Sequence, residues 1–201
     1  DYNTWRQLGN VGWNWNDVLP YFLKAENQEH GSSKFHNANG PLAVSDQRIR
    51  LNILDEFMNA AEEMGIPKVT DFNKGDNYGC GYFQVTVKNG LRCSTSVAYL
   101  KPIKNRNNLK IEIKAHVKNI DFENTKATGL SYWKNNKLIK VKAKKEVILS
   151  AGSIGSPHIL QVSGVGEYSK LKKHGIKVIH NSLGVGKNLQ DHLMMRPVYK
   201  V

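Results

Sequence analysis

Long hydrophobic runs are missing from this sequence. No stretch approaches the roughly 18 apolar residues that a membrane-spanning helix requires, so we expect no such helix. We also expect no signal peptide at the start of these residues. It starts without Met and stops at Val201 within an apolar stretch. We therefore expect an internal piece of a longer protein.

Cysteine is scarce, and the spacings that bind metals are absent. The chain has 2 cysteines, Cys80 and Cys93, far outside a C-x-x-C spacing. We interpret both as reduced packing residues, and a disulfide between them is the weaker alternative. The 7 histidines are scattered and form no H-E-x-x-H motif, so we expect no metal site.

Acidic residues are few beside basic ones, and the formal net charge is +12. Such a charge attracts nucleic acid. Most of the excess is lysine, however, whereas arginine is the residue that reads bases with two hydrogen bonds. The densest stretch places Lys140, Lys142 and Lys144 on alternate positions, as on the solvated face of a strand. We expect no nucleic-acid partner.

The first half of the chain predicts helices separated by turns. Asn16 is a candidate cap for a helix that runs towards Glu26 and that Pro20 breaks or delays. Apolar residues from Leu54 to Met64 recur at helical spacing and predict a helix that ends at Gly65. The remaining expectations are a surface loop at 30–40, a strand at 82–87, a tight turn at Asn89-Gly90 and a short helix at 93–101 closed by Pro102.

The second half predicts an antiparallel meander that leads into an α/β arrangement. Four alternating segments, 109–114, 117–123, 127–133 and 138–144, are separated by short turns that include Asn135-Asn136. A continuous apolar run at 146–150 is typical of a strand buried in a parallel sheet. After it we expect a helix capped by Ser156 with Pro157 at its first position, a helix at 168–175 and a strand at 176–179.

Ala151 and Gly152 follow the predicted buried strand, where ligands of α/β folds bind. Small residues there let a flat cofactor approach the backbone. No Gly-x-Gly-x-x-Gly follows this strand, so the pair would lie under a dinucleotide rather than around its pyrophosphate. The alternative is a tight strand-to-helix turn with no ligand.

At residues 152–166, "GSIGSPHILQVSGVG", the sequence resembles the second signature of the glucose–methanol–choline (GMC) oxidoreductases. We assign Ser156, Pro157, Ser163 and Gly164 within it to capping and close packing. Further stretches follow the order and spacing of that family: 9–22, 89–102, 108–122, 145–153 and 184–192.

The resemblance implies an FAD-dependent enzyme that oxidises an alcohol, with a hydride passing to flavin N5 and electrons then to an acceptor. By position in the family motifs, Val117 meets the adenine of FAD, and Ser150, Ala151 and Gly152 lie beside the cofactor. A structural role for Val117 is the alternative. His192 is not expected to be the catalytic base.

The resemblance also divides the chain. It implies an α/β fold in which residues 1–91 are part of an antiparallel-sheet substrate (cap) domain and 92–195 are part of a Rossmann-like FAD-binding domain with its β-meander. Residues 196–201 would start the next substrate-domain segment, with a strand beginning at Met195. The phosphate-binding glycine loop and the catalytic histidine are expected outside residues 1–201, so no catalytic residue is assigned within them.

The amino-acid sequence is most similar to bacterial choline dehydrogenases and aliphatic alcohol dehydrogenases at residues 35–46, 71–96 and 101–109. This implies choline or an aliphatic alcohol as substrate and a quinone or similar electron acceptor, with oxygen as the alternative. It also implies a cytoplasmic or inner-membrane location, with peripheral membrane association. A flavin-binding relative that has lost catalysis is the competing reading.

Overall fold

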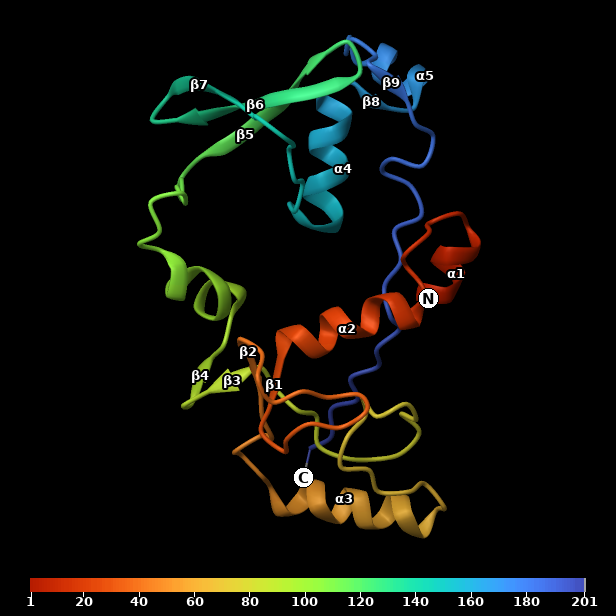
Figure 1. Cartoon of the computed structure of the whole chain (residues 1–201). Helices are drawn as coiled ribbons and strands as arrows, with labels where there is room; N and C mark the ends of the chain where they lie inside the picture. Colours follow the sequence, from red (N-terminus) through yellow and green to blue (C-terminus); the bar gives the residue numbers. More distant parts are fainter. Residues whose placement is uncertain (201) are drawn as a thin grey trace. The chain divides into compact units, whose positions relative to one another are not determined.

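The computed structural model describes residues 1–200, and the chain forms two compact units (Figure 1). The first unit is Asp1–Ile111, and the second begins at Glu112. The predicted domain boundary after residue 91 concerns the domains of the whole protein and stays a prediction.

The first unit consists of short helices, two small two-stranded sheets and long connecting loops. Its elements are α1 (Tyr2–Gln7), α2 (Trp15–Ala25), β1 (Glu26–Gln28), β2 (Leu42–Val44), α3 (Asn52–Glu63), β3 (Val87–Lys88), β4 (Leu91–Arg92), a π-helical turn (Ser96–Leu100) and a 3₁₀ turn (Lys101–Ile103). β1 pairs with β2 in parallel, and β3 pairs with β4 antiparallel.

Helix α2 begins two residues earlier than predicted. Its cap is Asn14, whose side chain accepts the N–H of Asp17, and the Asp17 carboxylate accepts the N–H of Asn14 in return. This reciprocal capping box satisfies two backbone donors, which Asn16 cannot do from inside the helix. The helix also continues through Pro20. The prediction that Asn16 caps the helix and that Pro20 breaks it is therefore wrong.

Two other predictions for the first unit are confirmed, and two are met only in part. Helix α3 covers the predicted apolar repeat, and Gly65 has a φ of 84° just after it. Asn89 and Gly90 have φ of 52° and 76° and connect β3 to β4, as a tight hairpin turn requires. The predicted strand at 82–87 is reduced to a single bridge between Ser45 and Val85 and to the start of β3. Pro102 lies within the 3₁₀ turn rather than closing the helix before it.

The second unit contains three of the four strands of the predicted meander. β5 (His116–Glu123), β6 (Lys126–Lys134) and β7 (Lys137–Lys142) form a three-stranded antiparallel sheet in chain order. Asn135 and Asn136 make the β6–β7 turn with φ of 49° and 58°. Both values lie in the left-handed region, which asparagine tolerates better than most residues.

Four predicted strands are not formed. Residues 109–114, 146–150, 176–179 and 195–200 have no strand assignment. A strand needs a neighbour to receive its backbone hydrogen bonds, and none of the strands described in residues 1–200 pairs with these segments. Ile148, expected to be buried, is 79% exposed. The apolar pattern predicts a strand, but a pattern does not supply the pairing partner.

The rest of the second unit is α4 (Gly152–Val162), β8 (Val165–Gly166), α5 (Tyr168–Lys173) and β9 (His180–Asn181), with β8 and β9 paired in parallel. Helix α4 begins before the predicted cap, and Pro157 lies inside it. Ser156 Oγ accepts the N–H of Ala151 at 3.0 Å, so this side chain closes the turn before the helix instead of capping a later start.

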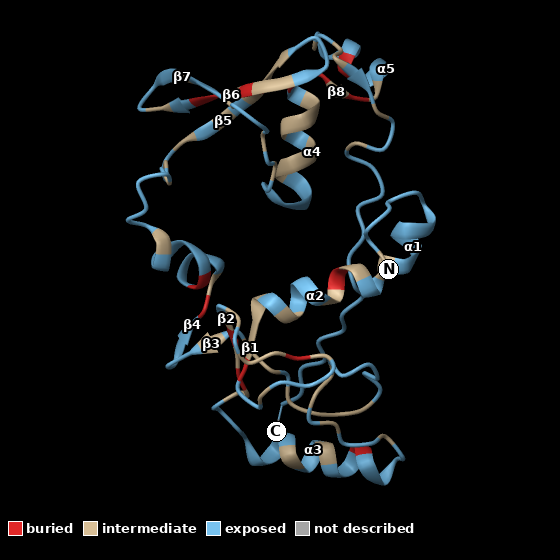
Figure 2. Ribbon diagram, viewed as in Figure 1, coloured by how far each residue is buried: buried red, intermediate tan, exposed pale blue. Residues whose placement is uncertain are grey.

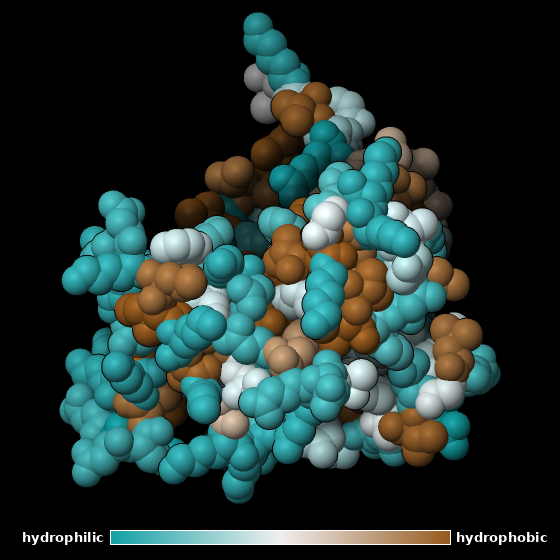
Figure 3. Space-filling view, turned by 90° about the horizontal axis from the view of Figure 1, so that it is seen from above, coloured by the Kyte–Doolittle hydropathy of each residue, from teal (hydrophilic) through white to brown (hydrophobic). Residues whose placement is uncertain are grey.

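Buried residues are few and dispersed along the ribbon (Figure 2). Apolar side chains stand between polar ones on the face shown in Figure 3, and the exposed large apolar residues include Leu8, Phe57 and Tyr199. No helix within residues 1–200 has the length and apolar character needed to cross a membrane.

Candidate functional site

Val117 lies near the start of β5 and is half-buried. It stands opposite Tyr132 of β6, and the ladder is irregular between Val117 and Asn119. A break of this kind frees backbone groups from the ladder. The backbone of β5 is thus irregular at the position where the resemblance expects a contact with adenine, and that contact stays a prediction.

Ser150, Ala151 and Gly152 are exposed and lead directly into α4. Gly152 has a φ of 82°, and a Cβ placed on it would meet no atom within 4 Å. The first N–H groups of a helix are unpaired and carry the positive end of its dipole. The three residues therefore form an open, small-residue approach to a helix N-terminus, which suits a flat anionic cofactor.

A buried serine joins α4 to β5. The Ile120 N–H donates to Ser163 Oγ at 2.8 Å, and Ser163 Oγ donates to the Ile159 carbonyl at 2.5 Å. Val117 and residues 150–152 thus lie on two elements that are hydrogen-bonded to each other. No hydrogen bond links Val117 itself to residues 150–152 among the described residues.

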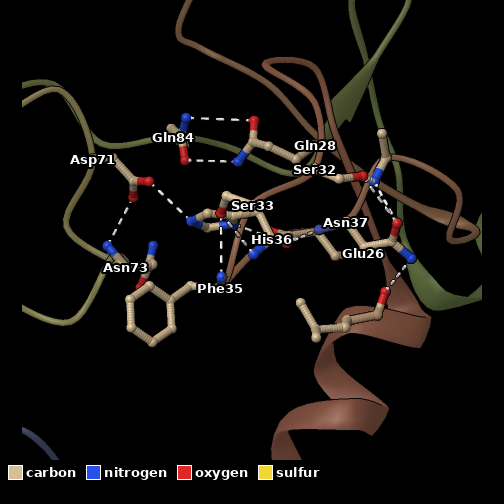
Figure 4. Close-up of polar contacts among 12 residues, drawn as sticks. Glu26, Gln28, Ser32, Ser33, Phe35, His36, Asn37, Asp71, Asn73 and Gln84 are labelled. Carbon is tan, nitrogen blue, oxygen red and sulfur yellow. Dashed lines mark hydrogen bonds and ion pairs between the residues drawn. The ribbon is translucent and has the colours of Figure 1, made fainter.

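The first unit contains a polar cluster that the sequence did not reveal (Figure 4). His36 is buried, although residues 30–40 were predicted to be a surface loop. Its Nδ1 lies 2.9 Å from Glu26 Oε2, and its Nε2 lies 2.9 Å from Asp71 Oδ2. The second contact has the distance of an ion pair without the alignment of a hydrogen bond. An imidazole faced by carboxylates on both sides ties together three segments that are far apart in sequence.

A pocket adjoins this cluster, and we call it the aromatic pocket. It has a volume of about 560 Å³ and lies entirely within the first unit. It is lined by Tyr2, Trp15, Leu19, Phe22, Ala25, Glu26, Phe35, His36, Leu42, Val44, Phe72, Asn73, Gly75 and Asn77. Only the richness in tryptophan at the start of the chain hints at it in the sequence, because its walls come from four separate stretches.

Beside the cluster, a second group of ionisable side chains lies at the surface. His30 Nε2 is 3.0 Å from Asp46 Oδ1, and Glu29 pairs with Arg48 at 2.7 Å. The hydrogen bond to Asp46 raises the pKa of His30 above its usual 6.5, and the same bond lowers the pKa of Asp46. Glu29, His30 and Asp46 are close enough to ligate one ion. The sequence did not predict this grouping, which brings together two loops that follow β1 and β2.

The remaining residues singled out from the sequence are isolated. His192 is exposed, and its backbone N–H bonds to Asp191 Oδ1 at 2.9 Å. Cys80 and Cys93 are both free thiols, and Cys93 is buried, which confirms the packing interpretation for that residue.

Comparison with known proteins supports one family over nearly the whole chain. The family model described as GMC oxidoreductase matches residues 1–194. Human mitochondrial choline dehydrogenase is 42% identical over 193 residues, which are 96% of this chain and 32% of the relative. The alcohol dehydrogenase (acceptor) of Pseudomonas putida is 41% identical over 96% of this chain and 36% of its own length.

A solved structure shows the same fold. An FAD-dependent oxidoreductase from Chaetomium thermophilum superimposes with a TM-score of 0.87 at 32% identity, over 94% of this chain and 35% of that one. This confirms the predicted α/β fold class. The chain spans about a third of the length of each of these proteins.

Proposed function

The chain belongs to the GMC oxidoreductase family, and we propose that the protein that carries it is an FAD-dependent oxidoreductase acting on the CH–OH group of choline or an aliphatic alcohol. The observation that carries this proposal is the match of residues 1–194 to the family, together with about two-fifths identity to choline and alcohol dehydrogenases.

The residues present fit the cofactor. Ser150, Ala151 and Gly152 leave the start of α4 uncovered, and Val117 stands at an irregular point of β5. These four residues would hold FAD, with the open backbone at Gly152 admitting its flat or anionic parts. When bound, FAD supplies the acceptor for the hydride of the alcohol. The contribution of these residues is to bind and orient, since no catalytic residue is assigned within the chain.

Other parts of the proposal concern the whole protein. The electron acceptor is a quinone or a similar carrier, in keeping with the word acceptor in the name of the Pseudomonas relative, and oxygen is the alternative. We further propose a cytoplasmic or inner-membrane-associated location with peripheral contact to the membrane. A membrane-fraction assay with added quinone distinguishes these acceptors, because an oxidase would produce hydrogen peroxide without quinone.

A matched pair of glycine variants tests the cofactor site. Gly152 and Gly175 both have left-handed φ values, 82° and 67°, and both have free space where a Cβ would stand. Valine at either position costs about 1–2 kcal/mol of backbone strain. Only Gly152 is assigned to FAD, so Gly152→Val should weaken FAD binding at least about tenfold while Gly175→Val leaves it unchanged.

The measurement is the FAD dissociation constant of the full-length protein, from flavin fluorescence after removal of the bound cofactor. Urea unfolding of both variants reports the shared strain separately. Equal loss of FAD affinity in the two variants would show that Gly152 acts through stability alone and would remove the cofactor assignment.

A further inference from the structure

The chain has two Asn-Gly pairs, Asn39-Gly40 and Asn89-Gly90, and the structure holds them differently. We propose that Asn89 is a site of spontaneous deamidation in the folded protein and that Asn39 is protected from the same reaction. The inference concerns a covalent modification and is independent of the proposed oxidation.

The reaction joins an asparagine side chain to the backbone nitrogen of the next residue. That nitrogen attacks the asparagine Cγ, a C–N bond forms, and the side-chain amide takes up the nitrogen's proton and leaves as ammonia. Water then opens the succinimide ring at one of its two carbonyls, which gives aspartate or isoaspartate. The reaction needs no reagent besides water. Glycine is the most favourable following residue, because it has no side chain to hinder the approach of its nitrogen.

Asn89 and Gly90 meet these requirements in an exposed turn. Both residues are exposed, and they connect β3 to β4. A Cβ placed on Gly90 would meet no atom within 4 Å. Among the residues that the structure describes, none accepts a hydrogen bond from the Gly90 N–H, and none bonds to the Asn89 side chain. Neither of the two reacting groups is therefore held back by a bond that must first break.

The hairpin around this turn opens at low cost. Ring closure requires rotation about the bond between Cα and the carbonyl carbon of Asn89, so that Cγ comes to face the Gly90 nitrogen. β3 and β4 have two residues each. Two-stranded hairpins are only marginally stable by themselves, and exposed turns with few buried contacts open locally far more often than a core does. The rotation is therefore accessible in the folded protein.

Gly40 is held in place, although Asn39 is exposed. The Gly40 N–H donates to the Glu26 carbonyl at 2.7 Å. A Cβ on Gly40 would lie 2.4 Å from the backbone of Ala25 and Glu26, so two chain segments are in close contact there. Attack by the Gly40 nitrogen would require this hydrogen bond to break and this packed backbone to separate. The protection comes from tertiary structure, and the Asn-Gly sequence itself is the same at both places.

Both products alter the hairpin. Aspartate at position 89 places a negative charge in a turn that follows Lys88. Isoaspartate runs the main chain through the former side chain and so adds one carbon atom to the backbone. The length of a two-residue turn fixes the register of the strands that it connects. We therefore expect isoaspartate to disrupt the pairing of Lys88 with Leu91.

The test follows both asparagines in the full-length protein during incubation in mildly alkaline buffer. Samples are digested with pepsin at acidic pH, where deamidation is slow, and the two peptides are quantified by mass spectrometry. Asn89 should deamidate at least about fivefold faster than Asn39, the factor that corresponds to one backbone hydrogen bond that must be broken. Electron-transfer fragmentation distinguishes isoaspartate from aspartate at each position.

The same incubation in urea is the control for sequence effects. Unfolding removes the difference in local opening, so the two rates should then lie within about twofold of each other. A matched pair of variants identifies the reacting residue, since glutamine must close a larger ring and reacts much more slowly. Asn89→Gln should lower the early release of ammonia from the folded protein, and Asn39→Gln should leave it unchanged. The proposal is overturned if Asn89 reacts no faster than Asn39 in the folded protein, or if the same ratio of rates persists in urea.

Discussion

At the scale of single residues, the structure gives physical reasons for parts of the signature that are conspicuous in the sequence. Ser163 and Gly164 were assigned to capping and close packing, and both contacts are confirmed. Ser163 Oγ accepts a hydrogen bond from the buried Ile120 N–H. A Cβ on Gly164 would lie 2.3 Å from the Lys177 carbonyl oxygen. The burial of His36 was not predicted. Nothing in the turn-rich sequence around it indicates that Glu26 and Asp71 lie on either side of its ring.

Gly164→Ala should destabilise the protein more than Gly175→Ala. Both glycines have left-handed φ values, 92° and 67°, and thus share a strain of about 1–2 kcal/mol for any other residue. Only at Gly164 does the new methyl group also collide with backbone, at Lys177. We expect an additional loss of at least about 1–3 kcal/mol in the free energy of unfolding, measured by urea denaturation of the full-length protein. Equal losses of unfolding free energy in the two variants would contradict this, because they would mean that the backbone at Lys177 moves away from the new methyl group without destabilising the protein.

At the scale of elements, the sequence predicted the turns and the strands that pair with their sequence neighbours. It did not predict correctly the strands whose partners would lie far away in the sequence. The Asn135-Asn136 and Asn89-Gly90 turns and the three meander strands follow from side-chain alternation and from left-handed residues between them. The segment at 146–150 has the apolar run of a buried strand, but a parallel partner must come from elsewhere in a fold. Periodicity describes one strand at a time, so the pairing could not be predicted.

Substitution of the two asparagines at the start of α2 tests which of them caps the helix. Asn14→Ala removes the side-chain acceptor of the Asp17 N–H and should cost about 1 kcal/mol. Asn16 is exposed inside the helix, so Asn16→Ala should change stability by less than about 0.5 kcal/mol. Thermal unfolding followed by circular dichroism measures both. A larger loss for Asn16→Ala would restore the helix start that the sequence suggested.

At the scale of the whole molecule, the two compact units each carry one candidate site. The second unit holds the four residues assigned to FAD, on β5 and at the start of α4, and the first holds the His36 cluster and the aromatic pocket. The family and its cofactor could be inferred from the spacing of short motifs, because such motifs are local in sequence. The aromatic pocket could not, because its lining residues range from Tyr2 to Asn77 and meet only in the folded chain.

The most direct test of the central claim is anaerobic mixing of the full-length, FAD-loaded protein with choline and, separately, with a series of aliphatic alcohols. We predict that at least one of these substrates bleaches the visible absorption of the flavin, and that adding a quinone restores it. A protein that binds FAD but keeps its absorption unchanged with every alcohol would contradict the account, and would identify the chain as part of a flavin-binding relative without this activity.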